Sequence, residues 1–229
     1  MTQYLRSQGF AQAQNMAGGI DASGPVSRGG GVVRERVAWL PELGLDFVIR
    51  IDGFAMRRIK DGERFQTDTG VLTAVATPGH APEHVCFLWT DGPAETDRSL
   101  FAGDMFMGGG DTTLVAPPEG SLTEYLASLD RLEALRPGAI HPAHGPPIAD
   151  GMEAIRRYRA HRAARIEQVV HALRHGAAAP RELIDRVYGA ELHPGLRGAA
   201  EGSLRAILAH LADTGRVRAS GDRHHLTDI

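Results

Sequence analysis

Three residues whose side chains can bind metals, His80, Asp104 and His144, each follow a short apolar run of the chain. Runs of this kind predict β-strands, and here they are residues 71–76, 99–102 and 139–140. Loops at strand ends hold side chains on a rigid sheet while leaving them accessible to a substrate. Two imidazoles and a carboxylate that can bridge would suit a hydrolytic metal site, which lowers the pKa of a bound water and keeps one coordination position open.

A single histidine at a strand end is more often a surface or hydrogen-bonded residue, so the elements around these side chains matter. Short strands are predicted at residues 48–51, 58–60, 71–76 and 85–89. The most distinct helix spans residues 121–135, where Ser121 and Glu124 have the spacing of a capping box and Pro137 follows the last apolar position. Several strands with a helix among them predict an α/β layered domain.

The pattern changes after residue 150. Helices are predicted at residues 152–175, from Pro180 onward and at 201–213, followed by a β-hairpin at 217–226. This is the element order of a winged helix-turn-helix. The first of these helices should carry a polar surface of Arg156, Arg157, Arg159, Arg162 and Arg165. A winged helix can contact nucleic acid through its third helix and wing, where the candidates are Arg205, Arg216, Arg218 and Arg223.

Composition sets the class of protein. The chain has 229 residues with 42% hydrophobic and 23% charged residues, which is typical of a globular protein of one medium and one small domain. Residues 1–150 hold 12 basic and 19 acidic residues, whereas residues 151–229 hold 13 arginines and 9 acidic residues. The single cysteine, Cys86, excludes an internal disulfide. With no apolar run of membrane-spanning length and no apolar signal core after Met1, we predict a cytoplasmic protein with no membrane contact.

Three sequence motifs resemble those of the metallo-β-lactamase superfamily. They are Thr-Pro-Gly-His at 77–80, Gly-Asp at 103–104 and Pro-Ala-His-Gly-Pro at 142–146. Their order and spacing, with the helix from Ser121 between the last two, are similar to the branch with a C-terminal winged helix, which includes endoribonuclease-like members. The resemblance covers residues 48–229. It implies an α/β fold: a metallo-β-lactamase-like αββα sandwich over residues 1–150, N-terminally incomplete and atypical over 1–47, followed by a winged-helix domain over 151–229.

The resemblance also implies roles for particular residues. His80 would bind the first metal, His144 the second, and Asp104 would bridge the two. Asp104 is thereby the candidate catalytic residue together with His84, which lies near the substrate edge in relatives. The implied cofactor is zinc, up to two ions, and the implied reaction is hydrolysis of an ester, a thioester or RNA. The tail more often packs on the catalytic domain in this family, so we expect a small-molecule or RNA substrate and no direct DNA readout.

The chain departs from the family at its principal metal motif, HxHxDH, because its first histidine of any kind is His80. Residues 11–16, Ala-Gln-Ala-Gln-Asn-Met, precede a Gly-Gly pair where that motif belongs, and offer no histidine or aspartate. Two interpretations stay open: residues 1–24 are a degenerate metal motif, or they are unrelated sequence that resembles the closing stretch of a rhodanese domain. Whether Met1 is the natural start is equally open.

The consequence follows from coordination number, since two four-coordinate zinc ions need about seven or eight ligand positions, some of them filled by water. Three protein ligands spread over both half-sites should hold at most one ion weakly. We therefore predict a metal-dependent hydrolase whose activity is impaired. The alternative is a non-catalytic or truncated homologue with an interaction or nucleic-acid-binding role through the winged helix. The sequence does not indicate an oligomeric state.

Overall fold

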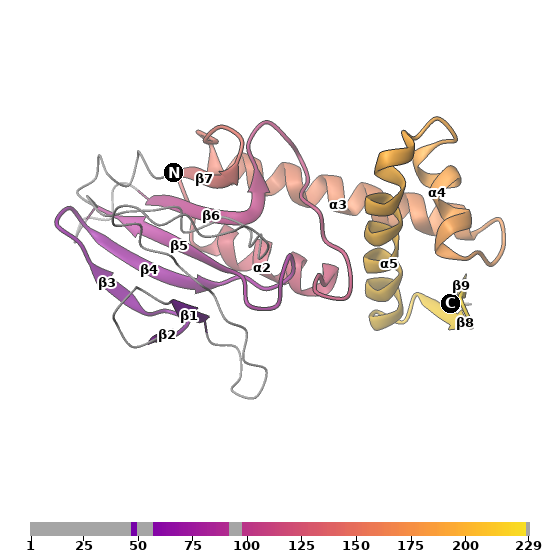
Figure 1. Ribbon diagram of the computed structural model, residues 1–229, viewed down its shortest axis with the longest axis horizontal. Coiled ribbons are helices and arrows are strands. Elements are labelled where there is room, and N and C mark those ends of the chain that lie inside the picture. Colours follow the sequence, from indigo (N-terminus) through magenta and orange to yellow (C-terminus); the bar gives the residue numbers. More distant parts are fainter. Residues whose placement is uncertain (1–46, 50–56, 92–97, 228–229) are drawn as a thin grey trace, which may run out of the picture. The chain divides into compact units, whose positions relative to one another are not determined.

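The computed structural model describes residues 47–49, 57–91 and 98–227 (Figure 1). Among these residues no helix is long and apolar enough to cross a membrane. The two interpretations of residues 1–24, and the atypical character of residues 1–47, fall almost wholly outside the described residues and stay predictions. Only the short strand β1, at Phe47–Ile49, touches that segment, and it pairs antiparallel with β2, Arg57–Ile59.

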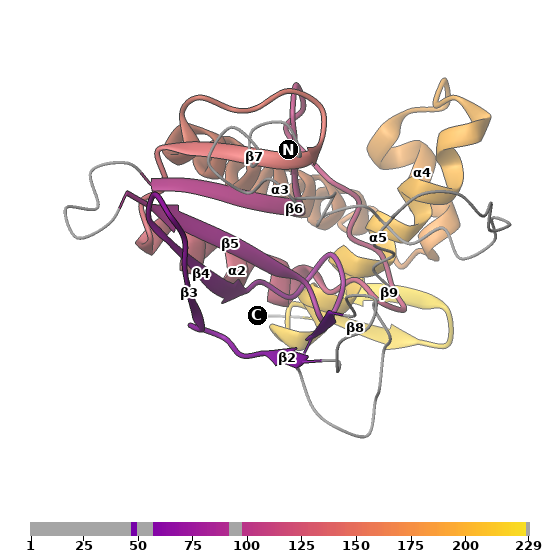
Figure 2. The same ribbon diagram turned by 60° about the vertical axis from the view of Figure 1, so that its left-hand side comes forward.

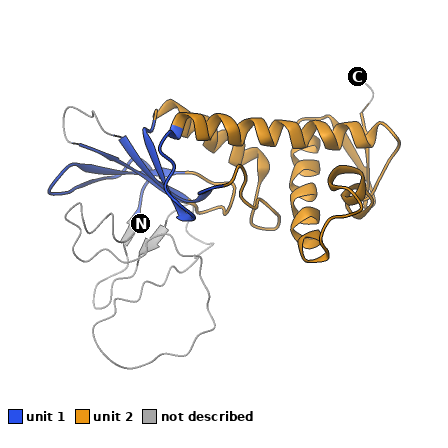
Figure 3. Ribbon diagram, turned by 90° about the horizontal axis from the view of Figure 1, so that it is seen from above, with its two compact units in different colours: residues 1–76, 85–109, 137–151 blue, residues 77–84, 110–136, 152–229 orange. Residues whose placement is uncertain are grey.

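The chain divides into two compact units (Figure 3). Unit 1 comprises residues 1–76, 85–109 and 137–151, and unit 2 comprises residues 77–84, 110–136 and 152–229. The boundary predicted after residue 150 falls where unit 2 resumes for the last time. However, unit 2 also takes in two segments from the first 150 residues, so the division into domains 1–150 and 151–229 stays a prediction from sequence.

Unit 1 contains a five-stranded sheet in the order β3-β4-β5-β6-β7 (Figure 2). The strands are β3 Arg64–Gln66, β4 Val71–Ala76, β5 Val85–Thr90, β6 Arg98–Met107 and β7 Ala139–His144. The first four are antiparallel neighbours, whereas β6 and β7 run parallel. Leu72, Trp89 and Phe101, one from each of the three middle strands, form a buried cluster. The apolar side chains of these strands are stabilised by packing against one another away from water.

The strand at residues 71–76 has the predicted bounds, but the strand predicted at 99–102 was too short. β6 continues to Met107, so Asp104 lies within a strand and not on a loop after one. The reason is Gly103, whose φ of 51° accompanies shifts in the pairing register between β6 and β7. Glycine tolerates this backbone conformation at little cost, so a strand can bend there and resume.

Unit 2 is helical apart from a small hairpin. Its elements are α2 Leu122–Ala134, α3 Gly151–Leu173 (from Met152 in this unit), α4 Pro180–Tyr188, the 3-10 turn η3 Pro194–Leu196, α5 Arg197–Asp213, β8 Val217–Ser220 and β9 Arg223–Leu226. Ser121 caps α2 as predicted, because its side chain accepts a hydrogen bond from the Glu124 N–H at 3.3 Å. Helices α3 to α5 followed by the β8–β9 hairpin confirm the predicted winged-helix order.

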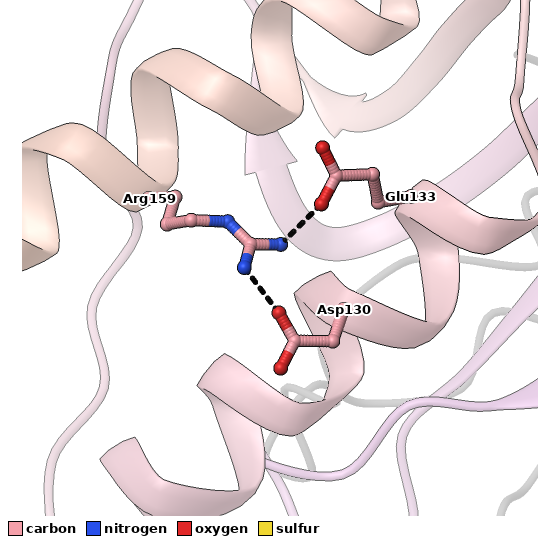
Figure 4. Close-up of polar contacts among 3 residues, drawn as sticks. All are labelled: Asp130, Glu133 and Arg159. Atoms are coloured by element: carbon pink, nitrogen blue, oxygen red, sulfur yellow. Dashed lines mark hydrogen bonds and ion pairs between the residues drawn. The ribbon is translucent and has the colours of Figure 1, made fainter.

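The arginines of α3 do more than form a polar surface. Arg159 reaches across to α2, where it pairs with both Asp130 and Glu133 (Figure 4). Arg162 is 5% exposed, so the prediction that it lies on the polar surface is wrong. A cation is buried only where other groups replace its water, and those groups are described below.

The two ion pairs of Arg159 link α3 to α2. We expect them to contribute modestly to the free energy of unfolding. Arg159→Met should lower the free energy of unfolding by about 0.5–1 kcal/mol at low salt, because these side chains are part exposed and exposed pairs are worth little. Urea unfolding at low and high salt measures this. Arg156→Met, which removes a pair with Glu153 inside α3, is the control and should have a smaller effect. A loss that does not shrink with salt would contradict the electrostatic explanation.

Candidate metal and catalytic residues

Asp104 and His144 come together in unit 1. They lie on the neighbouring parallel strands β6 and β7, with Oδ1 of Asp104 3.5 Å from Nε2 of His144. The carboxylate side chain is 23% exposed and the imidazole 63% exposed. The pair is therefore open to solvent on one side, as two ligands of a metal site would be.

The ends of these strands approach each other closely because both carry glycine. A Cβ on Gly145, whose φ is 82°, would lie 2.2 Å from the carbonyl oxygen of Gly108. The Gly108 N–H donates to the His144 carbonyl at 2.8 Å. Glycine in the motif after His144 is thus required by backbone contact, and this contact fixes where the imidazole emerges.

His80 belongs to unit 2, on the loop of residues 77–84. Its Nδ1 lies 2.7 Å from the Leu114 carbonyl oxygen, which can only accept, so Nδ1 carries the proton and donates it. In the neutral ring Nε2 then keeps its lone pair. Metal-binding histidines have this arrangement, in which a hydrogen bond from one nitrogen orients the other.

The same loop is fixed to α2 at its two residues before His80. Ser128 donates its hydroxyl to the Pro78 carbonyl at 2.7 Å, and the Ser121 N–H donates to the Gly79 carbonyl at 2.9 Å. Gly79 has a φ of 132°, and a Cβ there would lie 2.3 Å from Cα of Tyr125. The loop can lie against α2 only because this position has no side chain.

His84 is held at the other end of the loop. Its Nδ1 lies 2.8 Å from Oγ1 of Thr77, and its ring meets His80 edge-on with centroids 6.3 Å apart. Burial lowers the pKa of His84 to about 4, with a smaller lowering from His80, partly offset by a hydrogen bond with the Thr77 backbone. The imidazole is accordingly neutral at physiological pH. Its place near a substrate stays a prediction.

The predicted site residues fall into two pairs, His80 with His84 in unit 2 and Asp104 with His144 in unit 1. Over residues 57–91 and 98–227, no group of three or more His, Cys, Asp or Glu side chains is placed to hold a metal ion. A catalytic zinc needs three protein ligands and a water. The donors of each pair have suitable chemistry, but they do not fit a complete zinc site, so we derive no reaction step through the metal.

Two positions near His80 were not predicted from sequence. The Leu114 carbonyl is a backbone group and leaves no signal in residue type. Ser128 lies between apolar positions of an amphipathic helix, but it is 3% exposed and hydrogen-bonded. The position of this serine on the apolar face of the helix was the sequence feature that could have indicated a buried hydrogen bond.

Comparison with known proteins gives matches to both parts of the chain. Residues 179–224 match the β-lactamase-associated winged helix domain. A lactamase-like protein, adaB of Aspergillus niger, is 30% identical over 206 residues, which are 84% of this chain and 62% of that protein. A metallo-β-lactamase family protein from Thermus thermophilus has a similar structure, with a TM-score of 0.61 and 27% identity over 74% of this chain and 54% of that one.

The chain belongs to the metallo-β-lactamase superfamily. The predicted α/β fold with a C-terminal winged helix is confirmed. An atrochrysone carboxyl ACP thioesterase of Aspergillus fumigatus is a further relative, 26% identical over 82% of this chain and 45% of that protein. The chain spans between about half and two thirds of the length of these relatives.

Gly79 offers a test of how the metallo-β-lactamase motif loop is docked. Gly79→Ala should lower the free energy of unfolding by about 2–4 kcal/mol. Two costs add: the backbone strain of a positive φ at alanine, and a clash of its Cβ with the Tyr125 backbone. The matched control is Gly176→Ala, where φ is 112° but a Cβ would meet nothing within 4 Å. Strain alone should cost about 1–2 kcal/mol there. Equal losses in urea unfolding would contradict the close contact between the loop and α2.

The lowered pKa of His84 predicts a pH dependence of stability. The unfolded state takes up a proton at this histidine near its ordinary pKa of about 6.5, whereas the folded state does so at about 4. Stability should therefore fall as the pH drops from 6.5 to 4. Urea unfolding of the protein with a chelator present, at pH 7 and pH 5, measures this. His84→Gln should flatten the dependence, and an unchanged slope would show that other groups cause it.

Proposed function

We propose that the chain provides the downstream part of a metallo-β-lactamase-type hydrolase site and that, in a protein of these 229 residues, hydrolysis is impaired. The observation that carries the proposal is the pair of Asp104 and His144 at 3.5 Å, in a sequence whose first histidine is His80. One carboxylate and two imidazoles are the donors that hydrolytic zinc prefers, but they are fewer than two ions need.

The cofactor that superfamily membership implies is zinc, and we propose at most one weakly held ion. When bound, zinc would supply a hydroxide nucleophile and polarise a carbonyl. The contribution of this chain is to hold donors: His80 through the Leu114 carbonyl, and His144 against Asp104. We propose His84 as a neutral imidazole beside His80, available to a substrate as a hydrogen-bonding group.

The substrate class that we propose is a small thioester or ester. It is supported by the relative named as an acyl carrier protein thioesterase and by the charges of the winged helix. Of the four arginines proposed to contact nucleic acid, Arg205 pairs with Glu201, Arg216 with Glu167 and Arg223 with Glu182. Arginines already neutralised by carboxylates have little charge to offer phosphates.

The alternative function is a non-catalytic homologue that binds nucleic acid through the wing. Arg218 on β8 is its best candidate, because it is exposed and has no ion pair within the part of the chain that the structure describes. One free arginine predicts weak binding with a shallow salt dependence. We therefore keep RNA as the runner-up substrate and do not propose DNA as a partner.

Zinc content and thioester hydrolysis test the proposal together. After dialysis into zinc-free buffer, the protein should retain fewer than about one zinc ion per chain. It should hydrolyse S-acetyl-N-acetylcysteamine no faster than Asp104→Asn does. Asp185→Asn, which changes an exposed carboxylate paired with Arg197, is the matched control.

Retention of about two zinc ions per chain, with turnover lost in Asp104→Asn but kept in Asp185→Asn, would overturn the proposed impairment. It would show instead a complete hydrolase. Fluorescence anisotropy with a labelled RNA at low salt tests the alternative, since binding that Arg218→Ala abolishes would favour the nucleic-acid role.

A further inference from the structure

Arg162 is a buried cation without a carboxylate partner among the described residues. It lies on α3 and is 5% exposed. One of its Nη groups donates to the Thr113 carbonyl, and its guanidinium lies over the ring of Tyr125, 4.9 Å from the centroid. Its Nε has no hydrogen-bond partner in the described region. A charge buried with so few partners is costly, so each group that does contact the guanidinium matters for holding it.

The groups that Arg162 contacts are those that hold the loop of His80. Thr113, whose carbonyl it binds, immediately precedes Leu114, whose carbonyl accepts from Nδ1 of His80. Arg157, which precedes Arg162 on α3, pairs with Asp111 at 3.5 Å. The segment of residues 111–114 is thus anchored to α3 on one side and to His80 on the other.

A second connection runs through Tyr125. Its ring lies under the Arg162 guanidinium, and its backbone is the surface against which Gly79 packs. Gly79 directly precedes His80. Arg162 therefore contacts both supports of this histidine, the carbonyl segment that binds Nδ1 and the helix residue on which the loop lies. All of these residues belong to unit 2.

We propose that Arg162 is a positioning residue for His80: it fixes the peptide of residues 113–114 so that the Leu114 carbonyl holds the Nδ1–H tautomer and leaves Nε2 unprotonated. The use of that nitrogen for a metal rests on the proposed function, whereas the tautomer does not. Arg162 thereby links α3, the helix that precedes α4, to the segment and the helix that hold the His80 loop.

The proposal is tested by measuring which tautomer His80 adopts. Long-range ¹H–¹⁵N spectra of metal-free protein at pH 8 report it, and His80→Ala assigns the His80 signals. The wild-type protein should show the Nδ1–H form. Arg162→Met should lose that form and gain Nε2–H. Arg162→Lys, which keeps one cationic donor for the Thr113 carbonyl, should retain the wild-type pattern. Arg159→Met is the matched control, because it breaks a link between the same two helices (Figure 4) without touching residues 111–114.

A folded Arg162→Met protein with the wild-type His80 pattern would overturn the proposal. If Arg162→Met does not fold, exchange in the wild-type protein decides. The Arg162 Nη protons and the His80 Nδ1 proton should then exchange with the same dependence on urea, and independent opening would overturn the proposal. A protein that binds no zinc would refute a metal role for His80 and leave the tautomer result unchanged.

Discussion

The close backbone contact between Gly79 and Tyr125 is the constraint on which the arrangement around His80 depends. A loop can lie this near to a helix only where a side chain is absent, and the left-handed φ of Gly79 turns the chain so that the next residue leaves the helix surface. Once the loop lies there, Ser121 and Ser128 can bind its two carbonyls. The hydrogen bonds stabilise an approach that the missing Cβ permits.

Sequence predicted what periodicity and short-range spacing determine. The strand at 71–76 and the cap at Ser121 are local features, so they could be predicted. The continuation of β6 past Gly103 could not, because a bend with shifted pairing depends on the partner strand β7. The burial of Arg162 was missed for a similar reason. An arginine on a helix usually faces water, and only the packing of α2 and the segment 111–114 makes this one internal.

The winged helix also packs on α2, by way of α5. Thr123, on the first turn of α2, lies 2.9 Å from Nδ1 of His210 and donates to Asp213 at 3.1 Å. A Cβ on Gly202 of α5 would lie 2.8 Å from Cβ of Ala116. These contacts, together with arginines paired to carboxylates within the same unit, suit an element that supports the metallo-β-lactamase motif loop. A surface that reads nucleic acid would leave its cations free.

The anchors of the His80 loop are protein groups, and this has a consequence for the metal. In a structural zinc site the ion supplies folding energy, and the ligands have no fixed geometry without it. Here the loop is held by hydrogen bonds to protein groups of unit 2, which do not require an ion. They are made by Pro78, Gly79 and His80. The loop is therefore preorganised before any metal binds, so its geometry does not depend on a complete set of metal ligands. The Thr-Pro-Gly-His motif is therefore explained by the way this loop packs in the fold, whether or not the site is catalytic.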